Sequence, residues 1–357
     1  MRASPPGFRL LLLADTHLGF DEPVRPRTRR RRRGPEFFAS FRRVLNDAVD
    51  QQVDLVVHGG DLFFRSKVPD AIVDRVYAEL LAFAGHGIPL AIVPGNHERS
   101  RLPASLFLEH PGIHIFDEPR TFEFELGGAR VALGGFPNVR RNIREDFVSL
   151  VDATGVTGKP ADVRLLCTHQ TVEGARVGPA GYTFRSGHDV IRRRDLPASC
   201  DAVLAGHIHR HQVLEVPHDG RPPLPVIYPG STQRTSFAEA DESKGYSSLV
   251  FCAGSGGAWS LARHEFVELP TRPMVTVDVP GDLPPAAVGA FLDGVVREAP
   301  AEAIVRFRAA NQISPALAAA FSAGRVAERL PPTMNVQFGA GFFERRTTRR
   351  RIAEREP

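Results

Sequence analysis

The chain has 357 residues, 42% of them hydrophobic and 24% charged, which suits a large globular domain with a smaller appendage and excludes wholesale disorder. No apolar run approaches the roughly 20 residues that cross a bilayer, so no membrane partner is expected. Three widely spaced cysteines without a C-x-x-C pair argue against a disulfide framework and a zinc finger, and they favour a reducing, cytoplasmic location.

The net charge of +4 is unevenly distributed along the chain. Residues 25–33 hold seven arginines and no acid, and residues 344–357 carry a further net +3. Taking +7 and +3 away from +4 leaves −6 for the rest of the chain, so the basicity belongs to two short segments. Each such segment is either a solvated loop or tail or a contact with nucleic-acid phosphates.

The first hundred residues alternate between buried strands and amphipathic helices. Short runs of apolar residues predict strands at 8–13, 53–57 and 90–93, and apolar residues at helical spacing predict helices at 37–49 and 71–83. This βαβαβ order predicts a parallel sheet with helices packed on it.

Strands dominate the middle of the chain. A hairpin is expected around Gly127-Gly128. Further strands are predicted at residues 163–167, 202–205, 226–228, 246–252 and 259–266.

The sequence changes in character near Pro270. Strand patterns at 274–279 and 304–307 and helix patterns at 286–296 and 316–320 predict a small α/β appendage. We therefore expect a domain at residues 1–269, a small capping domain at 270–340 and a basic tail at 341–357.

Polar clusters follow five of the predicted strands. They are Asp15-Thr16-His17, Gly60-Asp61, Gly95-Asn96-His97-Glu98, His169 and Gly206-His207-Ile208-His209. Residues just beyond the carboxyl ends of strands in an open α/β sheet converge on one rim. Carboxylate, imidazole and amide oxygen together suit divalent first-row metals.

Any one of these clusters could arise by chance or hold a structural histidine. Five in this order predict a site for two metal ions. The candidate ligands are Asp15, His17, Asp61, Asn96, His169, His207 and His209. The remaining histidines, including His58 and His211, are predicted to be structural.

The ordered clusters resemble the calcineurin-like metallophosphoesterase superfamily. Three further segments are similar to SbcD-type DNA-repair exonuclease subunits, over roughly residues 8–270. They are Asp15-Thr16-His17-Leu18-Gly19, Gly60-Asp61-Leu62-Phe63, and Tyr228-Pro229-Gly230-Ser231 with Ser236-Phe237-Ala238-Glu239 and Lys244-Gly245. The resemblance implies an α/β fold, a layered sandwich of central β-sheets flanked by helices, with a small C-terminal capping domain.

The resemblance also implies roles for the clusters. One divalent ion, most often Mn²⁺ in this family, would take Asp15, His17, Asp61 and His209, and a second would take Asp61, Asn96, His169 and His207. His97 matches the catalytic histidine that contacts the scissile phosphate or protonates the leaving oxygen, and Glu98 is expected to orient it. Phe64 stands where many SbcD-type proteins carry histidine, and Glu98 where aspartate is commoner.

The implied function is metal-dependent hydrolysis of DNA phosphodiester bonds, as an exonuclease or endonuclease in DNA repair. The arginine run just after the first metal motif is expected to contact the DNA backbone. Its members are Arg25, Arg27, Arg29, Arg30, Arg31, Arg32 and Arg33.

The resemblance also suggests an SbcC-type ATPase partner, although only 17 residues follow Ala340, and it leaves a homodimer open. Two other functions stay open. One is a small-molecule phosphodiesterase or phosphatase that uses the same dinuclear site. The other is a non-catalytic interaction module on the same fold, which a loss of metal ligands would favour.

Overall fold

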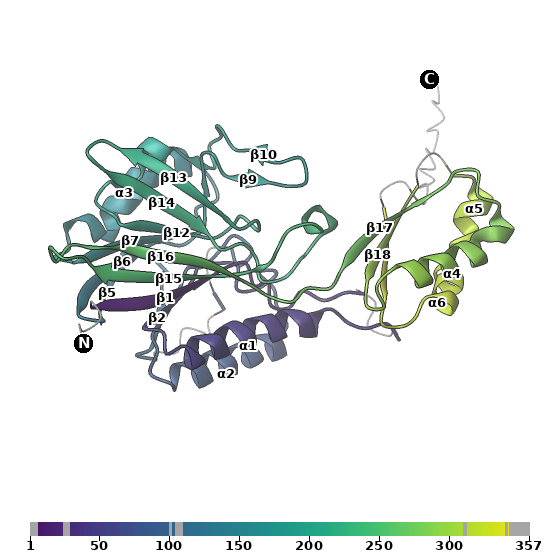
Figure 1. The fold of residues 1–357 in the computed structure, drawn as a ribbon, viewed down its shortest axis with the longest axis horizontal. Helices are drawn as coiled ribbons and strands as arrows, with labels where there is room; N and C mark the ends of the chain where they lie inside the picture. The colour runs from purple at the N-terminus through teal and green to yellow at the C-terminus, as the bar shows by residue number, and fades with distance from the viewer. Residues whose placement is uncertain are drawn as a thin grey trace, which may run out of the picture. The chain divides into compact units, whose positions relative to one another are not determined.

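The computed structural model of the chain describes residues 6–23, 29–99, 102–103, 110–309, 313–339 and 342. The chain divides into two compact units, one of residues 1–22 and 33–271 and one of residues 23–32 and 272–357 (Figure 1). Pro23 and residues 29–32 were expected in the first domain, and they belong to the second unit.

The first unit contains two six-stranded sheets. The first sheet has the order β16–β15–β1–β2–β3–β4. Its strands in that order are Trp259–Glu268, Gly245–Ala253, Gly7–Leu13, Leu55–His58, Leu90–Ile92 and Ile113–Ile115. The strands β1 to β4 are parallel to one another, and β15 and β16 continue the sheet in antiparallel pairs.

The second sheet has the order β13–β14–β12–β7–β6–β5. Its strands in that order are Gln212–His218, Arg221–Tyr228, Ala202–Ala205, Val163–Thr168, Ala129–Gly135 and Arg120–Leu126. The four central strands are parallel, and each edge strand pairs antiparallel with its neighbour. Strands β5 and β6 form the hairpin predicted at Gly127-Gly128.

Alternating side chains divide the first unit into layers. Leu10 and Leu12 of β1 pack between the two sheets, while Leu11 and Leu13 pack against helices α1 (Gly34–Asp50) and α2 (Asp70–Ala84). Successive residues of a strand face opposite sides, so one strand serves two cores. Helix α3 (Ile143–Thr154) covers the outer face of the second sheet. The layers are visible in Figure 1, with α1 and α2 below the sheets and α3 above them.

The first unit also contains several short elements. Four two-residue strands form the pairs β8–β11 and β9–β10, at Thr171–Val172, Val190–Ile191, Arg176–Val177 and Tyr182–Thr183. Single turns of 3₁₀ helix lie at Val156–Gly158, Arg193–Asp195 and Phe237–Glu239 in this unit, and at Pro285–Ala287 in the second unit.

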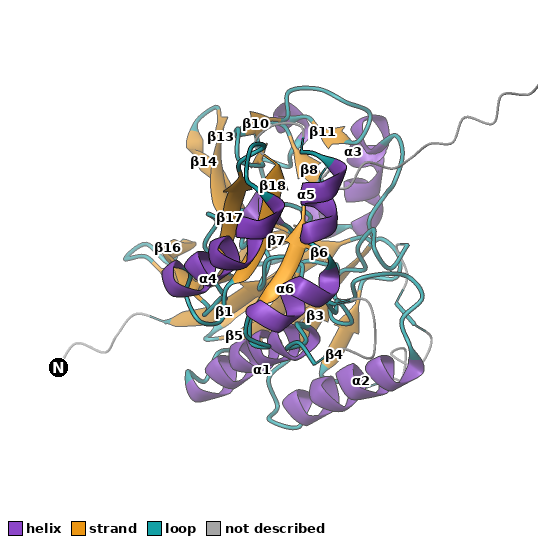
Figure 2. Cartoon of the chain, turned by 90° about the vertical axis from the view of Figure 1, so that its right-hand side faces the viewer, coloured by secondary structure: helices purple, strands orange, loops and turns teal. Residues whose placement is uncertain are grey.

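The second unit has a parallel sheet of three strands, β17–β18–β19, at Met274–Val279, Ile304–Ala309 and Asn335–Phe338. Helices α4 (Val288–Glu298), α5 (Pro315–Ala320) and α6 (Ala323–Arg329) pack on one face of it (Figures 1 and 2). Val305 and Phe307 of β18 are buried under these helices. Arg306 and Arg308 alternate with them and bond to Thr276 and Asp278 of the neighbouring strand.

Part of the arginine run is built into this second unit. The Arg30 guanidinium donates to the carbonyl oxygens of Val326, Pro331 and Met334 at 3.3, 3.1 and 2.9 Å. The Arg31 amide donates to the carbonyl of Pro332 at 2.8 Å. Carbonyl groups near the end of a helix attract a cation because the helix dipole leaves them partly negative.

We predict that Arg30→Ala destabilises the second unit. Hydrogen bonds to a charged group each contribute a few kcal/mol at most, so the free energy of unfolding should fall by about 2 kcal/mol. Urea unfolding measures this change. Arg29→Ala is the matched control, because Arg29 is exposed, and equal losses in the two variants would contradict the prediction.

Candidate metal centre

The two sheets bring the carboxyl ends of their parallel strands to one rim. The end residues that lie side by side are Leu13, His58 and Ile92 in the first sheet and Thr168 and Ala205 in the second. The sheets approach closely here, since a Cβ on Gly59 would lie 3.1 Å from the amide nitrogen of Gly206. The His169 ring donates from Nδ1 to the Gly59 carbonyl at 2.8 Å and so links the two sheets.

Backbone strain is concentrated at this rim. Of the seven described non-glycine residues with positive φ, four are candidate ligands: Asp15 at 51°, His17 at 46°, Asp61 at 54° and His207 at 83°. A side chain in the left-handed region costs free energy, which is accepted where function demands a particular geometry. The turns after β1, β2 and β12 are therefore shaped to direct these side chains.

Two glycines leave room for the donors. A Cβ on Gly60, whose φ is +106°, would lie 2.2 Å from the Nδ1 atom of His169. A Cβ on Gly95 would lie 2.1 Å from the Oδ1 atom of Asp61. Both contacts are far shorter than real atoms allow, so only glycine lets the chain pass these side chains.

One group of candidate metal-ligand atoms comes from the turn after β1 and the turn after β12. The Nε2 atoms of His17 and His209 are 2.9 Å apart, and His209 Nε2 lies 3.8 Å from Oδ1 of Asp15. Two imidazole nitrogens and a carboxylate oxygen thus point at one small space.

The second group of candidate metal-ligand atoms is centred on the Oδ1 atom of Asn96. That oxygen lies 3.0 Å from His169 Nε2 and 2.9 Å from His207 Nδ1. His169 Nε2 is also 3.4 Å from Oδ2 of Asp61. An amide oxygen, two imidazoles and a carboxylate again converge.

Asp61 lies between the two groups. Its ligand atoms lie within 4.8 Å of those of His17 and His97, and also of those of Asp15 and His169. The structure therefore brings all seven predicted ligands together, with Asp61 able to serve both groups.

The electrostatics of the site suit bound cations. Burial and the neighbouring His209 hold the pKa of His17 well below its usual value, and burial lowers that of His207 to about 3. These rings are neutral and offer lone pairs, as metal ligands must.

Burial also raises the pKa of Asp15 to about 6. Burial would lower the pKa of His169, but the Asp61 carboxylate raises it to about 9, which shows how strongly this buried carboxylate favours positive charge beside it. The donor set and its charge fit divalent metals.

Sequence comparison agrees with this geometry. The family model of the calcineurin-like phosphoesterases matches residues 8–211. The chain belongs to this family. The matched segment contains all seven candidate ligands and His97.

The relatives of this calcineurin-like phosphoesterase include archaeal proteins named DNA double-strand break repair protein Mre11. Those of Methanosarcina mazei, Haloferax volcanii and Halobacterium salinarum are 30, 31 and 31% identical over 78, 77 and 81% of the chain. The matched regions are 41, 55 and 67% of the relatives' lengths, so the chain spans about half of the first two.

Among the described residues, no helix is long and apolar enough to cross a membrane.

His97 is one of the partly exposed residues of the site, with a side chain 34% exposed against 26% for His209. Its amide donates to Asp61 Oδ1 at 2.9 Å, and its ring donates from Nδ1 to the Phe64 carbonyl at 2.5 Å. Nε2 lies 3.8 Å from Oδ2 of Asp61. The ring is therefore fixed at one nitrogen and presents the other to the site.

Glu98 has a different position from the one expected. Its two carboxylate oxygens accept hydrogen bonds from the amides of Phe63 and Gly95, at 2.6 and 2.8 Å. Burial and the charge of Asp61 raise its pKa to about 8. Glu98 thus fixes the two loops that carry Asp61 and Asn96. The group that orients the His97 ring is the Phe64 carbonyl and not Glu98.

His58 and His211, predicted to be structural, make contacts that fit this role. His58 is buried and its Nε2 lies 3.0 Å from Oγ1 of Thr16, which steadies the turn after β1. His211 bonds to the Tyr228 carbonyl at 2.9 Å and stacks on Phe266.

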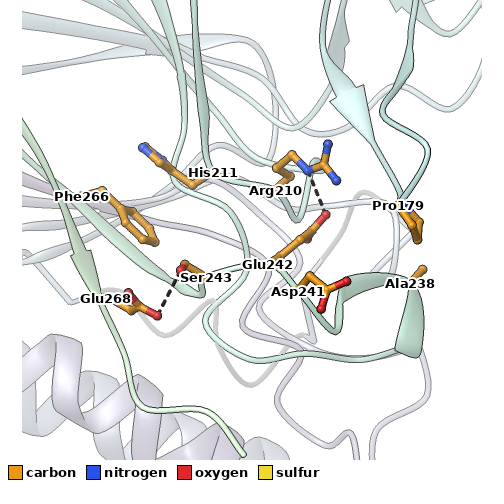
Figure 3. A pocket seen from close by; sticks show the side chains of 9 residues that line it. All are labelled: Pro179, Arg210, His211, Ala238, Asp241, Glu242, Ser243, Phe266 and Glu268. Carbon is orange, nitrogen blue, oxygen red and sulfur yellow. Dashed lines mark hydrogen bonds and ion pairs between the residues drawn. The ribbon is translucent and has the colours of Figure 1, made fainter. Parts of the chain in front are cut away.

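One cavity adjoins the centre, and a second adjoins the first. The first, of about 370 Å³, is lined by His207 and His209 and by residues of the segment 236–242. The second, of about 430 Å³, shares Arg210, Ala238 and Glu242 with the first and reaches Phe266 (Figure 3). The segment 236–242 therefore forms a wall common to both.

The arginine run is only partly available to a ligand. Arg25 and Arg27 lie outside the described residues, and Arg29 is exposed. Arg33 is buried, with its guanidinium over the Phe20 ring and bonded to the Arg234 carbonyl. The expected phosphate contact is therefore wrong for Arg33, and Arg30 and Arg31 are already bonded within the second unit.

Glu239 is a residue of the site whose role was not predicted. Its Oε1 atom lies 3.2 Å from Nδ1 of His209. The motif Ser236-Phe237-Ala238-Glu239 is visible in the sequence, but nothing local to it indicates that its carboxylate meets a histidine thirty residues earlier.

We predict that Gly95→Ala abolishes tight metal binding. The added Cβ would displace the Asp61 carboxylate, and metal affinity should fall at least about tenfold. Isothermal titration of the metal-free protein with Mn²⁺ measures this. Gly158→Ala is the control, because a Cβ there meets nothing within 4 Å. Unchanged Mn²⁺ affinity in Gly95→Ala would show that Asp61 does not hold metal.

Proposed function

We propose that this chain is a metal-dependent phosphodiesterase that hydrolyses DNA phosphodiester bonds, as an SbcD-like exonuclease or endonuclease in DNA repair. The observation that carries the proposal is the convergence of seven candidate ligand side chains, with the buried Asp61 carboxylate among them. The similarity to proteins named for DNA double-strand break repair supports DNA as the substrate.

The residues fit a division between two ions. Asp15, His17, Asp61 and His209 would hold one, and Asp61, Asn96, His169 and His207 the other. When bound, two divalent ions lower the pKa of water and offset the negative charge of the phosphodiester. Nitrogen and oxygen donors of this kind suit Mn²⁺, which we propose as the native ion.

The chain itself supplies the proton chemistry. The Phe64 carbonyl holds Nδ1 of His97, so that Nε2 faces the site. From there a protonated His97 can contact the scissile phosphate and pass its Nε2 proton to the leaving oxygen. Asp61 accepts the His97 amide and so keeps this histidine next to the donors.

We also propose a cytoplasmic location, a homodimer and an SbcC-type ATPase partner, on the basis of the sequence and its resemblance to SbcD-type proteins. Within the basic tail, residues 343–357 lie outside the described residues. A non-catalytic module ranks last because every expected ligand is present.

We predict that wild-type protein with Mn²⁺ degrades DNA and that Asp61→Ala and His97→Ala abolish this activity. Asp61→Ala should also lose metal, whereas His97→Ala should retain it. Assays on single-stranded, blunt and hairpin DNA across a panel of metals measure the activity. His86→Ala, at an exposed position, is the control. The proposal fails if His97→Ala matches wild type on every DNA.

We predict that Arg25, Arg27 and Arg29 contribute phosphate contacts to DNA binding. Each lost contact flattens the dependence of log K on log salt by about 0.9, so the triple alanine variant should lose a slope of about 2.7. Fluorescence anisotropy with labelled DNA measures this. Hydrolysis of bis(p-nitrophenyl) phosphate, which lacks a polyanionic backbone, should be unchanged. A steep salt dependence retained in the variant would place the contacts elsewhere, and its absence in wild type would favour a small-molecule substrate.

A further inference from the structure

The ring of His209 is held at both nitrogens. Nε2 faces His17 and Asp15, and Nδ1 lies 3.2 Å from the Oε1 atom of Glu239. An ionised carboxylate only accepts hydrogen bonds, so Nδ1 carries the hydrogen and donates it to Glu239. In the neutral ring, Nε2 then presents its lone pair to the other donors.

Glu239 is itself fixed in place. Its carboxylate is buried, and Oε1 also accepts from the hydroxyls of Thr235 and Ser236 at 2.8 and 3.2 Å. Oε2 lies 2.8 Å from the ammonium nitrogen of Lys244. A carboxylate with so many partners has little freedom to turn away from His209.

Lys244 connects the same network to the backbone of His209. Its fully buried ammonium donates to the His209 carbonyl at 2.9 Å and pairs with Glu242 at 2.9 Å as well as with Glu239. Glu242 in turn meets Arg210 at 3.0 Å, as Figure 3 shows. Three donors on one ammonium meet three acceptors, so both the ring and the backbone of His209 are tied to one segment.

Among the residues that the structure describes, the network reaches one of the two groups of candidate ligands and not the other. In the other group, the second ring nitrogen of His169 bonds to the neutral carbonyl of Gly59. A carboxylate partner makes an imidazole a stronger ligand than a neutral carbonyl does, because it stabilises positive charge on the ring. The two groups therefore differ in the support given to their histidines.

We propose that Glu239 is a positioning residue that holds His209 in the orientation and tautomer needed to bind metal, and that it acts on one of the two metal positions. This rests on the dinuclear centre of the proposed function. It gives the segment 236–244 a role that goes beyond forming the cavity wall.

The experiment is a titration of the metal-free protein with Mn²⁺ by calorimetry, with electron paramagnetic resonance of the bound ions. In Glu239→Ala, the affinity of one of the two metal equivalents should fall about 10- to 100-fold, and the other should stay unchanged. The signal of a spin-coupled manganese pair should be lost at metal concentrations that fill only the tighter position. Glu239→Gln keeps an acceptor for Nδ1 and should recover part of the lost affinity.

Asp241→Asn is the matched control. It removes one negative charge from the same segment at an exposed position, and both metal equivalents should bind as in wild type. The thermal unfolding of each metal-free variant, measured with a chelator present, separates positioning from folding. Glu239→Ala should unfold at a lower temperature, because Lys244 loses a buried partner, but it should remain folded at the temperature of the titration.

Four outcomes would overturn the proposal. They are unchanged affinity in Glu239→Ala, equal weakening of both equivalents, a loss in Asp241→Asn equal to that in Glu239→Ala, and no recovery in Glu239→Gln. DNA cleavage is a separate measurement. A wild-type protein that binds two ions but cleaves no DNA would refute the nuclease function and leave the role of Glu239 standing.

Discussion

The arrangement of the site depends on the buried carboxylate of Asp61, which needs positive charge or hydrogen bonds around it. Removing a carboxylate from water costs several kcal/mol unless positive charge or hydrogen bonds replace the water. Asp61 is 2% exposed, and it receives the His97 amide together with the nearby rings of His97 and His169. The close approach of the two sheets, the glycines and the left-handed turns all serve to bring these partners within reach. A pair of divalent cations would satisfy the same requirement more completely.

The rim shows how a stable framework carries a strained site. The strands that lead into it are buried on both faces and pack into two separate cores. Their apolar contacts stabilise the fold enough to keep Asp15, His17, Asp61 and His207 in left-handed conformations. Polar residues beside these ligands, such as Glu98 and Thr16, bond to backbone or to neighbouring side chains. Four of the seven described non-glycine residues with positive φ are thus ones whose side-chain direction matters to the site.

The sequence predicted what depends on local pattern. Strand β12 at Ala202–Ala205 and strand β17 at Met274–Val279 match their expected bounds, because short apolar or alternating runs define strands well. The candidate ligands could be predicted to lie together because the carboxyl ends of parallel strands meet at one rim. Helix α3 was not among the predicted elements, although Ile143, Phe147 and Val151 stand at helical spacing. The roles of Glu98 and Glu239 could not be predicted, since the direction of a carboxylate depends on partners distant in sequence, and the same holds for the carbonyls that bind Arg30.

The position of Arg30 has a consequence for the order of folding during synthesis. Its partners Pro331 and Met334 follow it by 301 and 304 residues. At 5–20 residues per second, a ribosome needs roughly 15 to 60 s to make that stretch. Through this interval the residues that accept hydrogen bonds from Arg30 have not yet been made. The arginine segment therefore leaves the ribosome long before its partner carbonyl groups do. This segment is thus made early but is among the last parts of the chain to reach its native contacts.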